Sequence, residues 1–186
     1  TNSISSTNIA GNSVTSTADL TLKTDTLSFV TPKPTLTAPR LSIRTSTDDR
    51  PITVGTTCNG AVTPNCLVVD PATMTLSVTD LVIGNSTVGD SDTTGDMYID
   101  SALSNPSNKI ILLGNGKVVQ TAGITAGTLA VKSNGTTNLN VAGNAFTSVA
   151  VNNSAGGINL KNSQNTTVIT LTGSAPVPTI AGLNAV

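Results

Sequence analysis

Pairs of apolar residues separated by a single residue recur along the C-terminal half of the chain. Each pair is flanked by Thr, Ser, Asn, Gly or Lys, and the pairs are Leu129/Val131, Leu139/Val141, Val149/Val151, Ile158/Leu160 and Ile169/Leu171. Alternation with a period of two residues predicts a short β-strand that buries one face. Turn formers such as Asn115-Gly116 and Asn134-Gly135 lie between these segments. We therefore expect short strands joined by tight turns.

These predicted strands repeat at a nearly constant distance. Leu129, Val149 and Ile169 follow one another in equal steps, and Ile110 lies one step of nearly the same length before the first of them. An interleaved series has a similar step and aligns Leu139 with Ile158 and Val141 with Leu160. A repeat of about 20 residues predicts a solenoid in which one period is one coil.

The N-terminal half repeats the pattern with insertions. Leu20/Leu22 and Leu41/Ile43 are one repeat apart, and Leu81/Ile83 follow after twice that distance, which we interpret as two coils. Further strands are expected between them, at Leu27/Phe29, Ile52/Val54, Met74/Leu76 and Met97/Ile99. The sequence thus predicts an all-β fold, a parallel β-helix or β-solenoid that occupies residues 1–186 as a single segment. Its dimensions would be about 20 residues per coil, about nine coils and a length on the order of 40–45 Å.

Composition narrows the alternatives. Of 186 residues 37% are hydrophobic, 10% are charged and 2% are aromatic, and the chain contains no His, Trp or Glu. A β-sandwich, the alternative fold, would usually bury a Trp or an aromatic cluster. The absence of His removes Ser-His-Asp and Cys-His machinery and ordinary zinc sites. A net charge of −1 without a basic run predicts no nucleic-acid partner, and no apolar stretch approaches the roughly 20 residues that would predict membrane insertion.

The two cysteines lie close together in the segment GTTCNGAVTPNCLVVD. Cys58 and Cys66 are separated by turn formers, and we favour a disulfide between them over a pair of reduced thiols. Such a bond would place the chain in an oxidising compartment such as the periplasm, the cell surface or the extracellular space. The segment 56–66 also interrupts the regular strand spacing, so it is expected to protrude from one corner as a disulfide loop.

Several segments resemble the haemagglutinin-type repeats of filamentous-haemagglutinin-like exoproteins, the secreted partners of bacterial two-partner secretion systems. The segments are DLTLKTDTLSFV, ATMTLSVTDLVIGN, TTGDMYIDSAL and ITAGTLAVKSNGTTNLNVAGNAF, and the resemblance covers residues 18–100 and 120–172. It implies a right-handed β-helical shaft that is exported through an outer-membrane barrel transporter. It also implies display on the bacterial cell surface or release from it, with adhesion as the usual activity. The signature motifs of the family's secretion domain are not found here.

A cluster of acidic residues is the only local feature of the sequence that could bind a metal ion or take part in catalysis. Asp90, Asp92 and Asp96 surround Gly95, an arrangement similar to a calcium loop, although the pattern lacks a third ligand before the Gly and a terminal Glu. A solvated turn is the simpler interpretation. The same carboxylates and Asp100 would be the candidates in a polysaccharide-degrading enzyme. Such sites normally have aromatic platforms and basic neighbours, and of these only Tyr98 is near. We expect no catalytic residues and no cofactor apart from weakly bound calcium.

Three functions follow from these observations. The first is a non-catalytic structural shaft of a secreted or surface-displayed adhesin, whose partners would be the transporter and a host or cell-surface receptor. The second is an extracellular filament subunit that stacks on neighbouring copies of itself, because neither end of the sequence resembles a cap. The third, less favoured, is a β-helical enzyme acting on polysaccharide.

Overall fold

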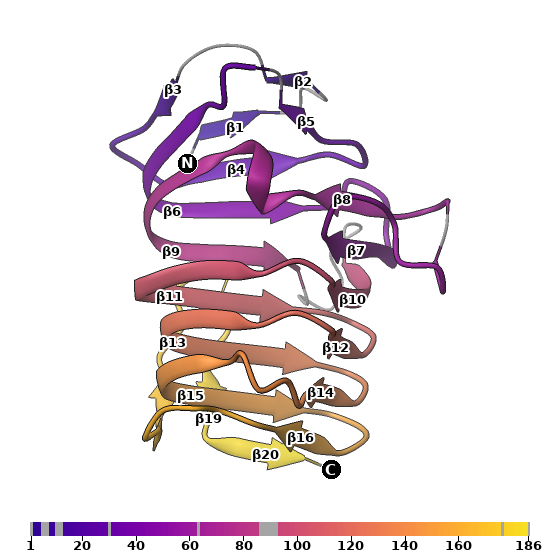
Figure 1. Ribbon diagram of the computed structural model, residues 1–186, viewed down its shortest axis with the longest axis vertical. Helices are drawn as coiled ribbons and strands as arrows, with labels where there is room; N and C mark the ends of the chain where they lie inside the picture. Colours follow the sequence, from indigo (N-terminus) through magenta and orange to yellow (C-terminus); the bar gives the residue numbers. More distant parts are fainter. Residues whose placement is uncertain are drawn as a thin grey trace.

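The computed structural model describes residues 2–4, 8–9, 13–29, 31–62, 64–85, 93–175 and 177–185. Over these ranges the chain is all-β, with strands stacked along the long axis and one short 3-10 turn, η1 (Pro71–Thr73) (Figure 1). Thr, Val and Ile favour extended backbone, and the spacing of Gly and Asn supplies the turns. No helix within these ranges is long and apolar enough to cross a membrane.

The larger sheet has ten strands, and most of its pairings join strands about one repeat apart, the exceptions being those of β9 with both of its neighbours and that of β15 with β20. Its path runs through β1 (Asn2–Ile4), β4 (Leu20–Lys23), β6 (Thr35–Arg44), β9 (Thr75–Gly84), β11 (Leu103–Leu113), β13 (Ile124–Ser133), β15 (Ala145–Asn153) and β17 (Thr167–Val168). Two further strands join this path at its sides, β3 (Ser13–Thr15) on β6 and β20 (Leu183–Ala185) on β15. All these pairings are parallel.

The second sheet has six parallel strands and lies beside the first (Figure 1). Its order is β16 (Ile158–Leu160), β14 (Thr137–Leu139), β12 (Val118–Gln120), β10 (Thr94–Ile99), β7 (Arg50–Val54) and β8 (Leu67–Val69). Two small sheets pair β2 (Asn8–Ile9) with β5 (Ser28–Phe29) and β18 (Thr170–Leu171) with β19 (Ile180–Ala181). From β6 to β16 the chain alternates between the two main sheets except at β7 and β8, which follow one another in the second sheet, and this arrangement is compatible with a parallel β-helix.

The core consists mainly of aliphatic side chains stacked between the sheets, together with Met74, Met97 and Phe146. Ile110 pairs with Leu129 and Leu129 with Val149, as the sequence spacing predicts, and Leu20 pairs with Leu41. The five side chains of these pairs are at most 1% exposed. Side chains alternate between the two faces of a strand, so a nearly constant repeat with turns of matching length returns the same face to the core at every step.

Three details of the predicted register are wrong. Leu81 pairs directly with Leu41, so the double-length spacing is one step of the larger sheet and not two coils. The surplus residues form β7, the disulfide loop, β8 and η1. Leu139 pairs with Leu160 in place of Ile158, and Val149 pairs with Val168 in place of Ile169. Sequence spacing alone cannot resolve a shift of one or two residues where turn lengths vary.

Residues 169–175 and 177–182, which we call the C-terminal strap, do not add another strand to the larger sheet. Side chains on the face of the larger sheet opposite the core form a second apolar cluster that includes Val82, Ile111 and Ala130. Leu171 and Ile180, on the two strands of the strap's antiparallel hairpin, belong to this cluster and are 9% and 0% exposed. Figure 1 shows this yellow segment running beside β13 and β15. The predicted strand at Ile169/Leu171 is therefore present as β18, but it pairs with β19 and packs on the outer face of the larger sheet.

Arg40 on β6 attaches the segment between β18 and β19 of the strap to the sheet. Its guanidinium donates to the carbonyl oxygens of Ser174 and Ala175 at 3.3 and 3.2 Å and to the Ser174 hydroxyl at 2.9 Å. The same group forms ion pairs with Asp19 at 3.4 Å and Asp80 at 3.3 Å. One largely buried cation thus joins the sheet to a segment that is remote in sequence.

Asn144 fixes one corner of the stack. Its side chain is fully buried, and its Oδ1 accepts from the backbone N–H of Ile124 at 2.9 Å and from Gln120 at 2.8 Å. Its Nδ2 lies 2.9 Å from the carbonyl oxygens of Leu139 and Lys161. One amide therefore satisfies backbone groups of three successive coils, at a point where the chain turns and strand pairing cannot do so.

Candidate binding groove

The predicted calcium ligands are only partly described by the structure. Asp90 and Asp92 lie outside the described residues. Asp96 accepts from the backbone N–H of Lys117 at 3.0 Å and from the Tyr98 hydroxyl at 3.2 Å, and it pairs with the Lys117 ammonium at 3.6 Å. Burial raises the pKa of Tyr98 above its ordinary value. Where the chain is described, no group of three or more His, Cys, Asp or Glu is placed to hold a metal ion.

The predicted disulfide between Cys58 and Cys66 is present, with the two Cα atoms 5.8 Å apart. The loop that it closes leaves β7 and returns as β8, and it extends away from the stack in Figure 1. Asn59 ties the loop to its neighbours, because its Nδ2 donates to Asp100 at 2.7 Å and its backbone N–H donates to Thr53 Oγ1 at 3.0 Å. Asp100 also accepts from the Thr121 hydroxyl at 2.9 Å.

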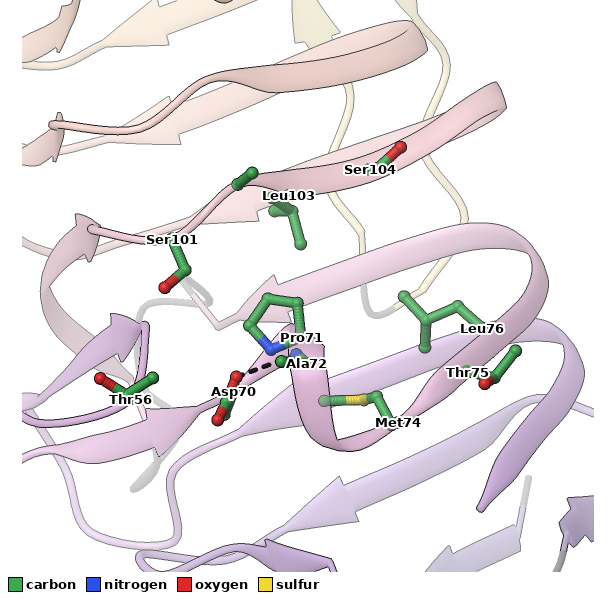
Figure 2. A pocket seen from close by; sticks show the side chains of 11 residues that line it. Thr56, Asp70, Pro71, Ala72, Met74, Thr75, Leu76, Ser101, Leu103 and Ser104 are labelled. Carbon is green, nitrogen blue, oxygen red and sulfur yellow. Dashed lines mark hydrogen bonds between the residues drawn. The ribbon is translucent and has the colours of Figure 1, made fainter. Parts of the chain in front are cut away.

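Beside this loop the larger sheet opens into a groove. Strands β9 and β11 pair only from Asp80/Lys109 onward, and their first halves lie apart. The space between them has a volume of about 530 Å³, and Met74, Leu76 and Leu103 are among the side chains that line it (Figure 2). A second hollow of about 410 Å³ continues toward the point where the strands meet.

The topology explains why the groove exists. In the six-stranded sheet, β7 lies between β8 and β10. The chain passes from β8 into β9 and from β10 into β11, whereas after β7 it turns into the disulfide loop. Strands β9 and β11 therefore begin about two strand spacings apart, on the order of 9.6 Å, and converge to one spacing at Asp80/Lys109. The groove is the position that a strand continuing from β7 would occupy.

Backbone groups point into the groove from both sides. The N–H of Thr75 donates to Pro34 on the far side of β9 at 2.9 Å, and the N–H of Leu103 donates to Gly123 on the far side of β11 at 3.1 Å. In a parallel strand, successive residues direct their N–H and C=O groups to opposite neighbours. Leu76 and Ser104, the next residues, therefore direct theirs into the groove.

Side-chain amides close the narrow end of the groove. The carbonyl oxygen of Val78 also faces β11, and it accepts from Asn108 Nδ2 at 3.0 Å and from Asn105 Nδ2 at 3.4 Å. Asn105 additionally donates to the Lys109 carbonyl oxygen at 3.1 Å. The bonds that a continuous sheet would form between backbones are thus replaced here by two asparagines, and strand pairing begins immediately afterwards.

The floor of the groove is apolar and its entrance is weakly acidic. Leu36 is fully buried, but its register partner Leu76 is partly exposed because no strand covers it on the side of β11. At the entrance, Asp70 caps η1 by accepting from the backbone N–H of Ala72 at 2.9 Å (Figure 2). No Lys or Arg lines the wide part of the groove within the described ranges. The groove therefore offers apolar contacts and backbone hydrogen bonds to a bound molecule, as a binding site does.

Unequal steps of the core ladder are the signal in the sequence that marks this groove. Steps of the core ladder are nearly constant elsewhere, but the step from Leu41 to Leu81 is twice as long, and the step from Leu81 to Ile110 is longer by about half. The two long steps flank β9, one of the two strands that form the groove.

Comparison of this chain with family models, with curated proteins and with solved structures gives no match. The resemblance to filamentous-haemagglutinin-like exoproteins therefore stays a prediction.

Proposed function

We propose that this chain is a right-handed parallel β-helix that serves as a non-catalytic structural shaft of a secreted or surface-displayed bacterial adhesin. The observation that supports this function best is the aliphatic ladder of the larger sheet. It continues in parallel register from strand to strand, through Leu20, Leu41, Leu81, Ile110, Leu129 and Val149. A count of about nine coils, which the length of the chain predicts, is part of this proposal.

Such a ladder is suited to spanning distance. Each coil buries its apolar face against its neighbours and hydrogen-bonds to them along the axis, so length is added without enlarging the cross-section of the core. The short disulfide loop agrees with an oxidising environment outside the cytoplasm. The proposed partners remain an outer-membrane barrel transporter during export and a receptor on a host or neighbouring cell afterwards.

Surface location gives a direct test of this function. Antibodies raised against the folded chain should label intact, unpermeabilised cells of the organism that encodes it, and external protease should remove the label. Particles coated with the chain should also adhere to target cells more than particles coated with a heat-unfolded sample. Retention of the antigen in the cytoplasmic fraction, with no labelling of intact cells, would contradict the proposal.

One observation favours the alternative of a filament subunit. Val168 and Leu183 pair with Val149 and Val151 on β15, so they continue the core ladder, yet they are 52% and 48% exposed. An apolar strand edge of this kind favours pairing with a further strand. Light scattering over a range of concentrations distinguishes the two functions. A filament subunit should grow in mass with concentration, and replacing Val168 and Leu183 by Lys should abolish that growth.

A further inference from the structure

We propose that the groove between β9 and β11 binds an extended polypeptide strand, which inserts between the two strands and completes the larger sheet at that level. This inference depends on the fold and not on the adhesin function. It assigns to the groove a partner of defined chemistry, a short peptide in β conformation that runs parallel to β9 and β11.

The hydrogen-bonding groups of the groove favour a peptide as the occupant. The N–H and C=O groups of Leu76 and Ser104 face one another across the space, each on an edge whose opposite side is already paired. The extra width is one strand spacing, because β7 fills the same level in the adjoining sheet. An inserted strand would donate to and accept from both edges, as in β-strand addition at a free sheet edge.

The lining sets the sequence that the groove would accept. An inserted strand would place one side chain inward over Leu76 and Leu103, which favours a residue such as Leu, and the neighbouring side chains outward beside Thr75 and Ser104. The strand β6 shows this pattern at the same level of the sheet, where Thr35–Ala38 reads Thr-Leu-Thr-Ala.

Charge sets a further preference. A parallel strand that continued from β7 would enter with its N-terminal end at the acidic entrance beside Asp70. Because no Lys or Arg lines that wide part within the described chain, a basic N-terminal residue should be favoured over an acidic one.

The test uses the complete chain and the acetylated, amidated peptide Lys-Gly-Thr-Leu-Thr-Ala-Gly. Residue-resolved amide hydrogen exchange should show fast exchange of Leu76 and Ser104 in the free protein. Saturating peptide should slow the exchange of both at least 10-fold. Thr75 and Leu103 donate to Pro34 and Gly123, so their amides should be protected in both states. This pattern marks an inserted strand, because a peptide lying on the surface would not reach the two inward-facing amides.

Matched controls separate the contribution of backbone hydrogen bonds from nonspecific binding of the peptide. N-methylation of the peptide's Thr-Leu-Thr amides should weaken binding at least 10-fold, and replacing its Lys by Glu should weaken it several-fold. In the protein, Ala102→Trp places a large side chain at the groove, whereas Ala142→Trp places one on an exposed turn away from it. Only the first variant should lose binding, and both should keep the circular dichroism spectrum of the parent chain.

Three results would overturn the proposal. The first is unchanged exchange of Leu76 and Ser104 at millimolar peptide. The second is binding that tolerates both N-methylation and Ala102→Trp. The third is protection of these two amides in the free protein that rises with protein concentration, because the occupant would then be a second copy of the chain.

Discussion

Replacing the corner asparagine Asn144 by Ala should destabilise the protein far more than its small change in volume implies. The side chain satisfies the N–H of Ile124 and the carbonyl groups of Leu139 and Lys161. Removing the amide leaves the Ile124 N–H and the Lys161 carbonyl without this partner, whereas the Leu139 carbonyl still accepts from the backbone N–H of Lys161 at 3.1 Å. Each buried unsatisfied group costs about 1–3 kcal/mol, so at the low end of that range we expect a loss of about 2 kcal/mol in the free energy of unfolding.

Urea denaturation followed by circular dichroism measures this loss. With a slope of about 2 kcal/mol per molar urea, the midpoint should fall by about 1 M. The control is Asn138→Ala, because Asn138 is exposed on β14 in the same coil and its replacement should change stability by less than about 0.5 kcal/mol. Amide exchange supplies a local readout, since Ile124 should lose its protection in the Asn144→Ala variant alone.

If the two variants unfolded at the same urea concentration, the hydrogen bonds of the Asn144 side chain would not stabilise the fold. A midpoint shift for Asn144→Ala below about 0.5 M would mean that water satisfies the Ile124 N–H and the Lys161 carbonyl in place of the amide. The corner would then be solvated, and Asn144 would serve only to fill space there.

Three further predictions concern the ladder, the strap and the acidic groups. Val149→Asp places a carboxylate in the ladder next to Leu129, so protease should cut near residues 140–160, and a variant as resistant as the parent would contradict the register. Arg40→Met removes the contacts to the strap and should speed proteolysis within residues 169–182, whereas Lys109→Met, which affects only the ion pair with Asp80, should not. Burial alone would raise the pKa of Asp25, but hydrogen bonds from Thr47 and Ser46 lower it to about 2. A lowered pKa stabilises the fold above the unfolded value of 3.8, and this contribution is lost as pH falls from about 4 to 2. Asp25→Asn should therefore cost about 1 kcal/mol at pH 7, after allowance for screening of this partly exposed group, and much less at pH 2, where the carboxyl is about half protonated, as urea denaturation at the two pH values would show.

The residue pattern alone was enough to predict an all-β fold of parallel strands and several steps of the ladder. Period-two alternation that recurs at a nearly constant spacing admits few arrangements, because stacked parallel strands return the same face to the core at each step. The pairings of Leu20 with Leu41 and of Leu129 with Val149 follow from this arithmetic. The disulfide also followed from sequence, because two cysteines eight residues apart across turn formers can meet without the rest of the fold.

Where the spacing departs from the repeat, the outcome depends on packing between distant segments. The sequence shows that Leu41 and Leu81 are two repeat lengths apart, but it does not show whether the surplus forms a coil or a loop. That outcome depends on β8 pairing beside β7, a contact whose energy is not encoded in local propensity, and the groove follows from it. In the same way, Ile169 and Leu171 carry the alternation of a ladder strand, yet Leu171 packs on the opposite face of the sheet. Alternation specifies that a side chain is buried, and only the packed structure specifies which surface buries it.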